Sequence, residues 1–217
     1  MSARRRSVFL LGLAVLPGTI HAQVGLAVRG SSLGIGAELS LRSGKNLGLR
    51  LGGNYFQFSR DITVERNRYR ASPHFENGTA IVDLYPFGGV FHLSGGVILN
   101  YNEGRLSAYL PVTLNGRDYT PAEVTELSAS VTFKRSAPYA GIGLAGRGRI
   151  ALLVDIGVGF TATPIVSLNG ETTLTGAERD EFEARLAQEQ ESVQAEMNRH
   201  SWLKYHPVLS LGLKVGF

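Results

Sequence analysis

The chain ends in Tyr205-His-Pro-Val-Leu-Ser-Leu-Gly-Leu-Lys-Val-Gly-Phe217, and this stretch decides the fold class. Its large apolar residues alternate with small or polar ones, which predicts a β-strand with one apolar face. A tilted strand of about 9–11 residues crosses the hydrocarbon core of a membrane. The stretch therefore predicts the closing strand of a transmembrane β-barrel, as found in bacterial outer membranes.

The last residue, Phe217, adds a second indication of a barrel. A terminal aromatic resembles the signal that outer-membrane barrels present to their assembly machinery. We therefore expect the partners to be this machinery, outer-membrane lipid and lipopolysaccharide, and we expect a monomer.

The start of the chain predicts export. Residues 1–6 carry three arginines, residues 8–16 are mostly large and apolar, and Ile20-His-Ala22 has a small residue at a plausible cleavage point. The apolar core is too short to span a bilayer. We predict a signal peptide at 1–22 and one barrel domain at 23–217, located in the outer membrane.

The composition excludes other classes. No later segment has about eighteen uninterrupted apolar residues, so a helical membrane protein is excluded and a closed barrel remains. The absence of cysteine is compatible with a closed sheet. The net charge of +4 includes the three arginines of the expected signal peptide, so no nucleic-acid partner is implied. We expect no cofactor and no bound metal.

Eight alternating segments can be counted from residue 24 onward, which predicts an all-β, eight-stranded antiparallel barrel. An even number puts both chain ends on the periplasmic side, with short turns near Ser43, Pro86 and Gly146. The long connections around Arg60 and Asn115 then lie outside, as does a helical insert before the last strand.

Parity along each strand assigns side chains to two faces. At 150–160, Ile150, Ile156 and Phe160 are expected to face lipid and Asp155 the lumen. At 33–41, the lipid-facing set is expected to begin with Leu33.

The period changes between residues 170 and 204, where Phe182, Leu186, Val193 and Met197 form a thin apolar stripe. This predicts an acidic helix at 176–199, with Thr175 as a possible cap. Gln190 interrupts the stripe. We favour a lid, with Phe182 and Leu186 folded over the barrel mouth. The alternative is that calcium or magnesium bridges the carboxylates to lipopolysaccharide.

Charged residues at lumen-facing positions form the main candidate site. Buried charges persist only when they are paired and hydrogen-bonded. The favoured interpretation is a polar plug, and a gated or lateral pathway is the alternative. The expected network consists of Arg29, Glu38, Arg50, Asp83, Arg135, Asp155 and Lys214.

Three short motifs resemble catalytic or nucleotide-binding patterns. His92 and Ser94 share a strand face, like the pair in barrel lipid A deacylases, but they face the lumen near a periplasmic turn and Gly95 replaces the usual asparagine. The patterns at 30–34 and 141–146 match a nucleophile elbow and a dinucleotide fingerprint, but strands follow both where helices are needed.

Four segments support a resemblance to a family of small bacterial outer-membrane β-barrel proteins with a helical insert before the last strand. They are Tyr85-Pro-Phe-Gly-Gly89, Ala137-Pro-Tyr-Ala-Gly-Ile-Gly143, Asp155-Ile-Gly-Val-Gly-Phe160 and Pro207-Val-Leu-Ser-Leu-Gly212. The wider relatives are similar to the barrel domain of outer-membrane protein A and to W-type small barrels. The resemblance implies a barrel and transfers no catalytic residue.

The functional hypothesis is a structural or interaction protein that acts through its outer loops and is not an enzyme. A narrow channel or lateral conduit for small apolar molecules is the first alternative. A lipid A-modifying enzyme is the second.

Overall fold

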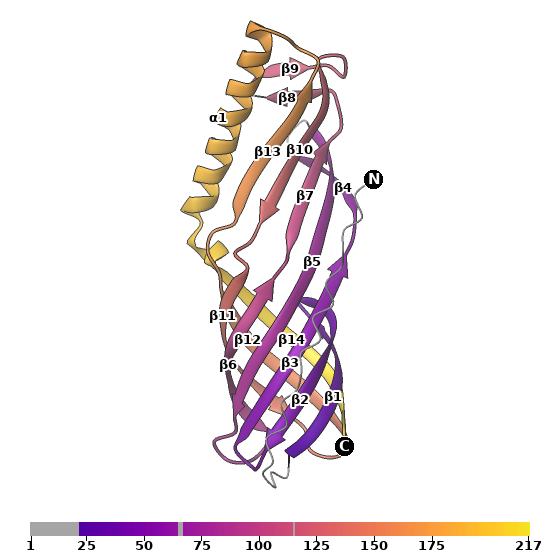
Figure 1. The fold of residues 1–217 in the computed structure, drawn as a ribbon, viewed down its shortest axis with the longest axis vertical. Helices are drawn as coiled ribbons and strands as arrows, with labels where there is room; N and C mark the ends of the chain where they lie inside the picture. The colour runs from indigo at the N-terminus through magenta and orange to yellow at the C-terminus, as the bar shows by residue number, and fades with distance from the viewer. Residues whose placement is uncertain (1–21, 65–66, 115) are drawn as a thin grey trace.

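A closed antiparallel barrel of eight strands forms the base of the molecule (Figure 1). The computed structural model describes residues 22–64, 67–114 and 116–217. The barrel strands are β1 (Ala22–Ser31), β2 (Gly34–Ser43), β3 (Leu47–Gln57), β5 (Asn67–Leu84), β6 (Phe91–Asn100), β11 (Ser136–Ala145), β12 (Ile150–Phe160) and β14 (Tyr205–Gly216). The pairing of β1 with β14 and of β5 with β6 closes it. The predicted fold class is confirmed.

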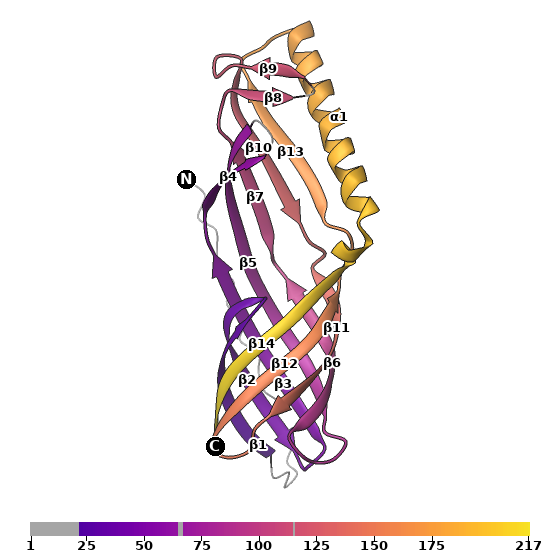
Figure 2. The same ribbon diagram turned by 180° about the vertical axis from the view of Figure 1, so that it is seen from behind.

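The expected signal peptide falls outside the described residues, except for Ala22, which begins β1. Both β1 and β14 have their chain-end residues at the same end of the barrel, where Gly25 pairs with Gly216 (Figure 2). The turns after Ser43, after Leu84 and at 146–149 lie at this end too. No helix in the described part of the chain is long and apolar enough to span a membrane.

At the opposite end the same sheet extends beyond the barrel, where the sequence predicted long connections. The strands of this extension are β4 (Arg60–Val64), β7 (Glu103–Ala108), β10 (Val124–Thr132) and β13 (Ile165–Thr172), beside the hairpin β8 (Val112–Leu114) and β9 (Arg117–Tyr119). The 18 residues of β5 run from the barrel into this extension, where β5 pairs with β4 and β7. Around Arg60 the segment is a strand extension, which the sequence left open against a loop.

The helix α1 (Ala177–Arg199) lies along β13 and is followed by the 3₁₀ helix η1 (Ser201–Lys204) (Figures 1 and 2). Its N-cap is Gly176, at φ 58°, and not Thr175 as predicted. We call β4, β7, β8, β9, β10, β13 and α1, with the outer part of β5, the outer module.

The outside of the barrel is an apolar belt. Leu26, Val28, Leu152, Ile156 and Leu211 are all more than half exposed. This is the arrangement expected of a surface that faces hydrocarbon.

Leu33 departs from the predicted pattern and is only 5% exposed. It lies in the turn between β1 and β2, where the parity of the strand no longer holds. Its side chain enters the lumen and packs with Ile81, Ile98, Ala137, Tyr139 and Val208. The hairpin tip therefore contributes to the core of the barrel.

We expect Ile156→Arg to destabilise the barrel by roughly 2–4 kcal/mol, because a charge on the lipid face near the midplane is poorly solvated. Its neighbour Asp155 points into the lumen and is 3% exposed. Asp155→Asn should leave insertion intact and weaken only the lumen contacts. Reversible unfolding in lipid vesicles measures both variants, and similarly small losses at the two positions would contradict the assigned faces.

Candidate functional site

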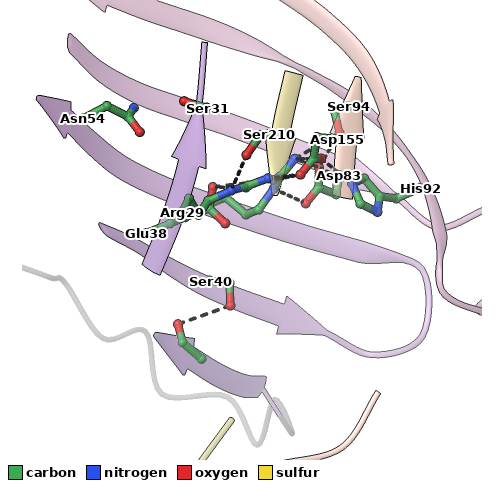
Figure 3. Close-up of polar contacts among 12 residues, drawn as sticks. Arg29, Ser31, Glu38, Ser40, Asn54, Asp83, His92, Ser94, Asp155 and Ser210 are labelled. Atoms are coloured by element: carbon green, nitrogen blue, oxygen red, sulfur yellow. Dashed lines mark hydrogen bonds and ion pairs between the residues drawn. The ribbon is translucent and has the colours of Figure 1, made fainter. Parts of the chain in front are cut away.

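Polar side chains from seven different positions meet inside the barrel (Figure 3). We call them the lumen network; they are Arg29, Glu38, Arg50, Asp83, His92, Ser94 and Asp155. Each is 7% exposed or less. They come from β1, β2, β3, β5, β6 and β12, because the inward parity of each strand falls at the same height.

Arg50 holds the network together. Its Nε lies 2.6 Å from Asp83 Oδ2, its Nη2 lies 3.1 Å from Asp155 Oδ1, and its Nη1 lies 3.5 Å from Glu38 Oε2. Arginine suits this position because its planar guanidinium presents several donors in a fixed geometry. One cation therefore contacts three buried carboxylates, each of which would be strongly destabilising if it were unpaired.

Arg29 supplies the second cation. Its Nη1 lies 2.6 Å from Glu38 Oε2, its Nη2 contacts Asp155 Oδ2, and its Nε donates to Ser210 Oγ at 2.9 Å. The contact with Ser210 ties the network to the closing strand β14. Glu38 and Asp155 are thus shared between the two arginines.

His92 and Ser94 belong to the network as well, although they were not among its predicted members. His92 Nε2 lies 2.9 Å from Asp155 Oδ1, and the Ser94 hydroxyl donates to Asp83 Oδ1 at 2.7 Å. The sequence could have indicated this, because both residues occupy inward-facing positions of their strand, as Asp83 and Asp155 do. Gly143 makes room for His92 and Asp155, since a Cβ there would lie 2.6 Å from His92 Nε2 and 2.6 Å from Asp155 Oδ1.

The geometry gives His92 and Ser94 a structural role. A nucleophilic serine needs a base within hydrogen-bond reach of its hydroxyl. Here the Ser94 hydroxyl donates to Asp83, and the His92 ring bonds Asp155 instead. The two residues therefore connect neighbouring carboxylates across the lumen.

The two remaining cations of the predicted network, Arg135 and Lys214, lie elsewhere. Arg135 is exposed just before β11, beyond the barrel mouth, and its carbonyl accepts the N–H of Asn100 at 2.7 Å. Lys214 faces inward but is too near the chain-end rim to reach the carboxylates, and it lines a cavity there. The alternation in the sequence predicts which face of a strand a residue lies on, but it does not predict the residue's height along the barrel axis. Arg135 and Lys214 lie at different heights from the lumen network.

Phe217, the predicted assembly signal, lies at the same rim and is 79% exposed. Its N–H donates to the Val24 carbonyl at 2.8 Å. Its role in assembly stays a prediction. Among the described residues, no group of three or more His, Asp or Glu side chains is placed to hold a metal ion.

The lumen network separates two cavities. On the outer side, a cavity of about 30 Å³ is bounded by Arg29, Arg50, Leu33 and Tyr139. Between the network and the chain-end rim, a cavity of about 310 Å³ is lined in part by Arg50 and Asp83. The outer cavity is large enough to hold ordered water. The network therefore occupies the part of the lumen that lies between these two cavities.

The outer module has its own apolar core, separate from the barrel. Phe182 of α1 is fully buried, and its ring centroid lies 5.3 Å from that of Tyr119. The other members of this core are Val112, Leu114, Val124 and Leu127, with Leu186 packed beside them. The expected lid over the barrel mouth is therefore wrong, because Phe182 and Leu186 instead pack against the hairpin β8–β9 and the strands β10 and β13.

Two glutamines on α1 explain why its apolar stripe is interrupted. The strand β13 is an edge strand of the sheet in the outer module. The Gln190 side-chain oxygen accepts the N–H of Leu168 at 2.8 Å, and that of Gln194 accepts the N–H of Val166 at 2.9 Å. The helix therefore covers the free backbone groups of an edge that would otherwise pair with other chains.

We expect Gln190→Leu to speed hydrogen exchange at the Leu168 amide, because a part-buried N–H loses its acceptor at a cost of about 1 kcal/mol. Gln188 is exposed on the same helix and is the matched control. Exchange measured by NMR should change little in Gln188→Leu. If the two substitutions speeded exchange at the Leu168 amide equally, the change would reflect helix propensity and not the hydrogen bond between Gln190 and Leu168.

Two carboxylates of the outer module are stabilised in their charged forms. The N–H and hydroxyl of Thr120 donate to Glu123 Oε2 at 2.9 and 2.8 Å and lower the pKa of this carboxyl. The hydrogen bond from Arg185 lowers the pKa of Glu181, which also lies 3.3 Å from Arg117. Arg117 lies 3.8 Å from Glu123 as well, so the two carboxylates share this cation.

These lowered pKa values predict a pH dependence of the outer module. The charged carboxylates stabilise the folded outer module. This stabilisation is fully present above the ordinary glutamate pKa of about 4.3, and it is lost as the pH falls through the lowered pKa values of the folded state. We expect carboxyl-carbon NMR titrations of Glu123 and Glu181 to have midpoints below that ordinary value. Thr120→Val should move the Glu123 midpoint up and leave the Glu181 midpoint in place. A Glu123 midpoint insensitive to this change would contradict the assigned cause.

No protein-family model and no curated protein matches the sequence. Among solved structures, the chain is similar to Acinetobacter baumannii CarO, at 18% identity and a TM-score of 0.58, covering 89% of this chain and 97% of CarO. For Acinetobacter baumannii CarO2 the identity is 18% and the TM-score 0.59, with 90% and 98% covered. Both are outer-membrane β-barrels, and at this identity the likeness shows the fold alone. A specific likeness to outer-membrane protein A stays a prediction.

Proposed function

We propose that the protein is exported to the outer membrane and that its barrel anchors the outer module as an interaction surface outside the cell. The apolar belt of the barrel and its likeness to CarO support this location. Outer-membrane lipid, lipopolysaccharide and the barrel-assembly machinery are then its expected partners, and the protein acts as a monomer.

The observation that carries this proposal is the contrast between the lumen and the outer module. The lumen is filled by a paired network next to a cavity of about 30 Å³. The outer module has a separate core and a helix that covers its edge strand. A chain whose transmembrane part is filled and whose outer part is independently built is suited to binding other molecules on the outer side.

Labelling of introduced cysteines tests the location, because the natural chain has none. Ser192→Cys on α1 and Ser43→Cys at the chain-end rim both replace exposed serines. A membrane-impermeant maleimide should label Ser192→Cys on intact cells and should label Ser43→Cys only after lysis. The opposite pattern would overturn the proposal.

Single-channel recording tests the alternative conduit function. The purified barrel in a planar bilayer should show no stable conductance, because paired side chains of the lumen network occupy the barrel between the two cavities. Steady conductance that Asp155→Asn increases would favour the conduit instead. Mass spectrometry of lipid A from expressing cells tests the enzymatic alternative, and its profile should be unchanged by the protein.

A further inference from the structure

The cavity at the chain-end rim has a feature that the proposed function does not use. It measures about 310 Å³ and is lined by β1, β2, β3, β14 and the turn at 146–149. A wider hollow of about 640 Å³ adjoins it and shares Gln23, Arg42, Arg147 and Gly148. We call the two together the rim cavity.

The charged residues that line the rim cavity are almost all basic. They are Arg42, Lys45, Arg50, Asp83, Arg147, Arg149 and Lys214. The single acidic side chain, Asp83, is already paired with Arg50. Phe217 also lines the cavity and adds an apolar ring to its wall. The rim cavity therefore has an excess of positive charge that the described residues do not neutralise.

Lys214 is one of the two most buried of these cations after Arg50, which the lumen carboxylates already pair. Its stem crosses Gly25 so closely that a Cβ there would lie 2.8 Å from Lys214 Cδ. The side chain is half-buried, and within the described ranges it forms no ion pair. Glu38 and Asp83 act on its charge from further away, but they are already paired with Arg29 and Arg50. A partly buried ammonium group without a counter-ion is unfavourable, and a bound anion would remove this cost.

Arg42 is held in a fixed orientation beside it. Its guanidinium lies 3.7 Å from the centroid of the Tyr85 ring. Its Nη2 donates to the carbonyl oxygens of Lys45 and Gly89 at 2.8 and 3.0 Å. Because these bonds all involve Nη2, the Nη1 and Nε groups remain available as donors. Across the opening, Arg147 is also fixed through a contact of its Nη2 with the Gly88 carbonyl.

We propose that the rim cavity is a binding site for a phosphate-bearing anion, with Lys214 and Arg42 as its inner ligands and Arg147 and Arg149 at its opening. Oriented guanidinium groups match the oxygens of phosphate, and lysine adds a point charge. A group with more than one negative charge and several acceptor oxygens uses several such donors at once. The source is either a free phosphate monoester or the headgroup of a membrane phospholipid.

This site is at the opposite end of the barrel from the outer module, so it does not depend on the proposed interaction function. Failure of the labelling experiment above would leave the rim cavity and its charges unchanged. The two proposals can therefore be rejected separately.

Calorimetric titration of the purified, detergent-solubilised barrel tests the site. The probes are inorganic phosphate and glycerol 3-phosphate, in a phosphate-free buffer of low ionic strength. Lys214→Gln should weaken binding by tenfold or more, and Lys214→Arg should retain it. Lys134 is an exposed cation near the barrel mouth, so Lys134→Gln is the matched control and should bind like the natural chain. The heat-dependent gel mobility of each variant shows whether its barrel is folded.

A second arm separates the two sources. Native mass spectrometry from nanodiscs that contain phosphatidylglycerol and phosphatidylcholine should show retained phosphatidylglycerol if the ligand is a lipid headgroup, and Lys214→Gln should lose it. Binding of soluble phosphates without lipid retention identifies a free monoester. The proposal is overturned if neither probe shows binding that depends on Lys214, or if Lys134→Gln weakens binding equally.

Discussion

Replacing Arg50 with leucine is expected to destabilise the barrel by about 3–5 kcal/mol, the largest effect of any substitution in the lumen. The guanidinium of Arg50 contacts Glu38, Asp83 and Asp155. Arg29 still contacts Glu38 and Asp155 in the variant, but Asp83 loses its cation. A buried carboxylate left unpaired in this way costs far more than the pair contributed.

Urea-induced unfolding in lipid vesicles measures this loss. Arg135→Leu removes an arginine that is exposed and lies outside the network, so it should change stability by less than about 0.5 kcal/mol. If Arg50→Leu were as mild as Arg135→Leu, the lumen would be far more hydrated than its burial indicates. The double substitution Arg50→Leu with Asp83→Leu should recover part of the loss, because it removes both members of the pair.

Phe182→Ala is expected to destabilise the outer module by about 3–5 kcal/mol and to leave the barrel intact. Phe182 is fully buried, and its ring packs edge-on against Tyr119. Truncation leaves a cavity between α1 and the hairpin β8–β9. Hydrogen exchange should then become faster in α1, β8, β9 and β13 and stay slow in the barrel strands.

Val193→Ala provides the comparison, because Val193 lies on the same helix but is 37% exposed. Its effect should be well below that of Phe182→Ala. Loss of protection throughout the barrel in Phe182→Ala would contradict the view that the outer module has a separate core. Unchanged exchange in α1 would mean that the helix is held mainly by Gln190 and Gln194.

Sequence alone predicted the barrel well and the outer module poorly, for one physical reason. Barrel strands contact lipid on one face and a polar lumen on the other, so their residues alternate clearly, as in β12. The strands β7 and β10 carry mostly small residues on their less polar face, as Gly104 and Ala129 show, so their alternation is weak. Only contacts between distant segments, such as β10 with β13, determine that they are strands.

The lumen network shows a similar division. Parity placed Arg29, Glu38, Arg50, Asp83 and Asp155 inside the barrel, and these five side chains do meet. It placed Lys214 on the correct face as well, but the register between strands decides which inward residues share a height. The register of β14 against β1 and β12 is a tertiary property.

The seam between β1 and β14 bears on the order in which the molecule folds. Arg29 and Ser210, which bond across this seam, are 181 positions apart in the chain. Closing such a loop costs about 2–3 kcal/mol more entropy than closing a ten-residue hairpin. Contacts this distant slow folding, so the seam is expected to form last. Until it forms, β1 and β14 both present unpaired backbone edges, which is the interval in which the chain is most exposed to aggregation.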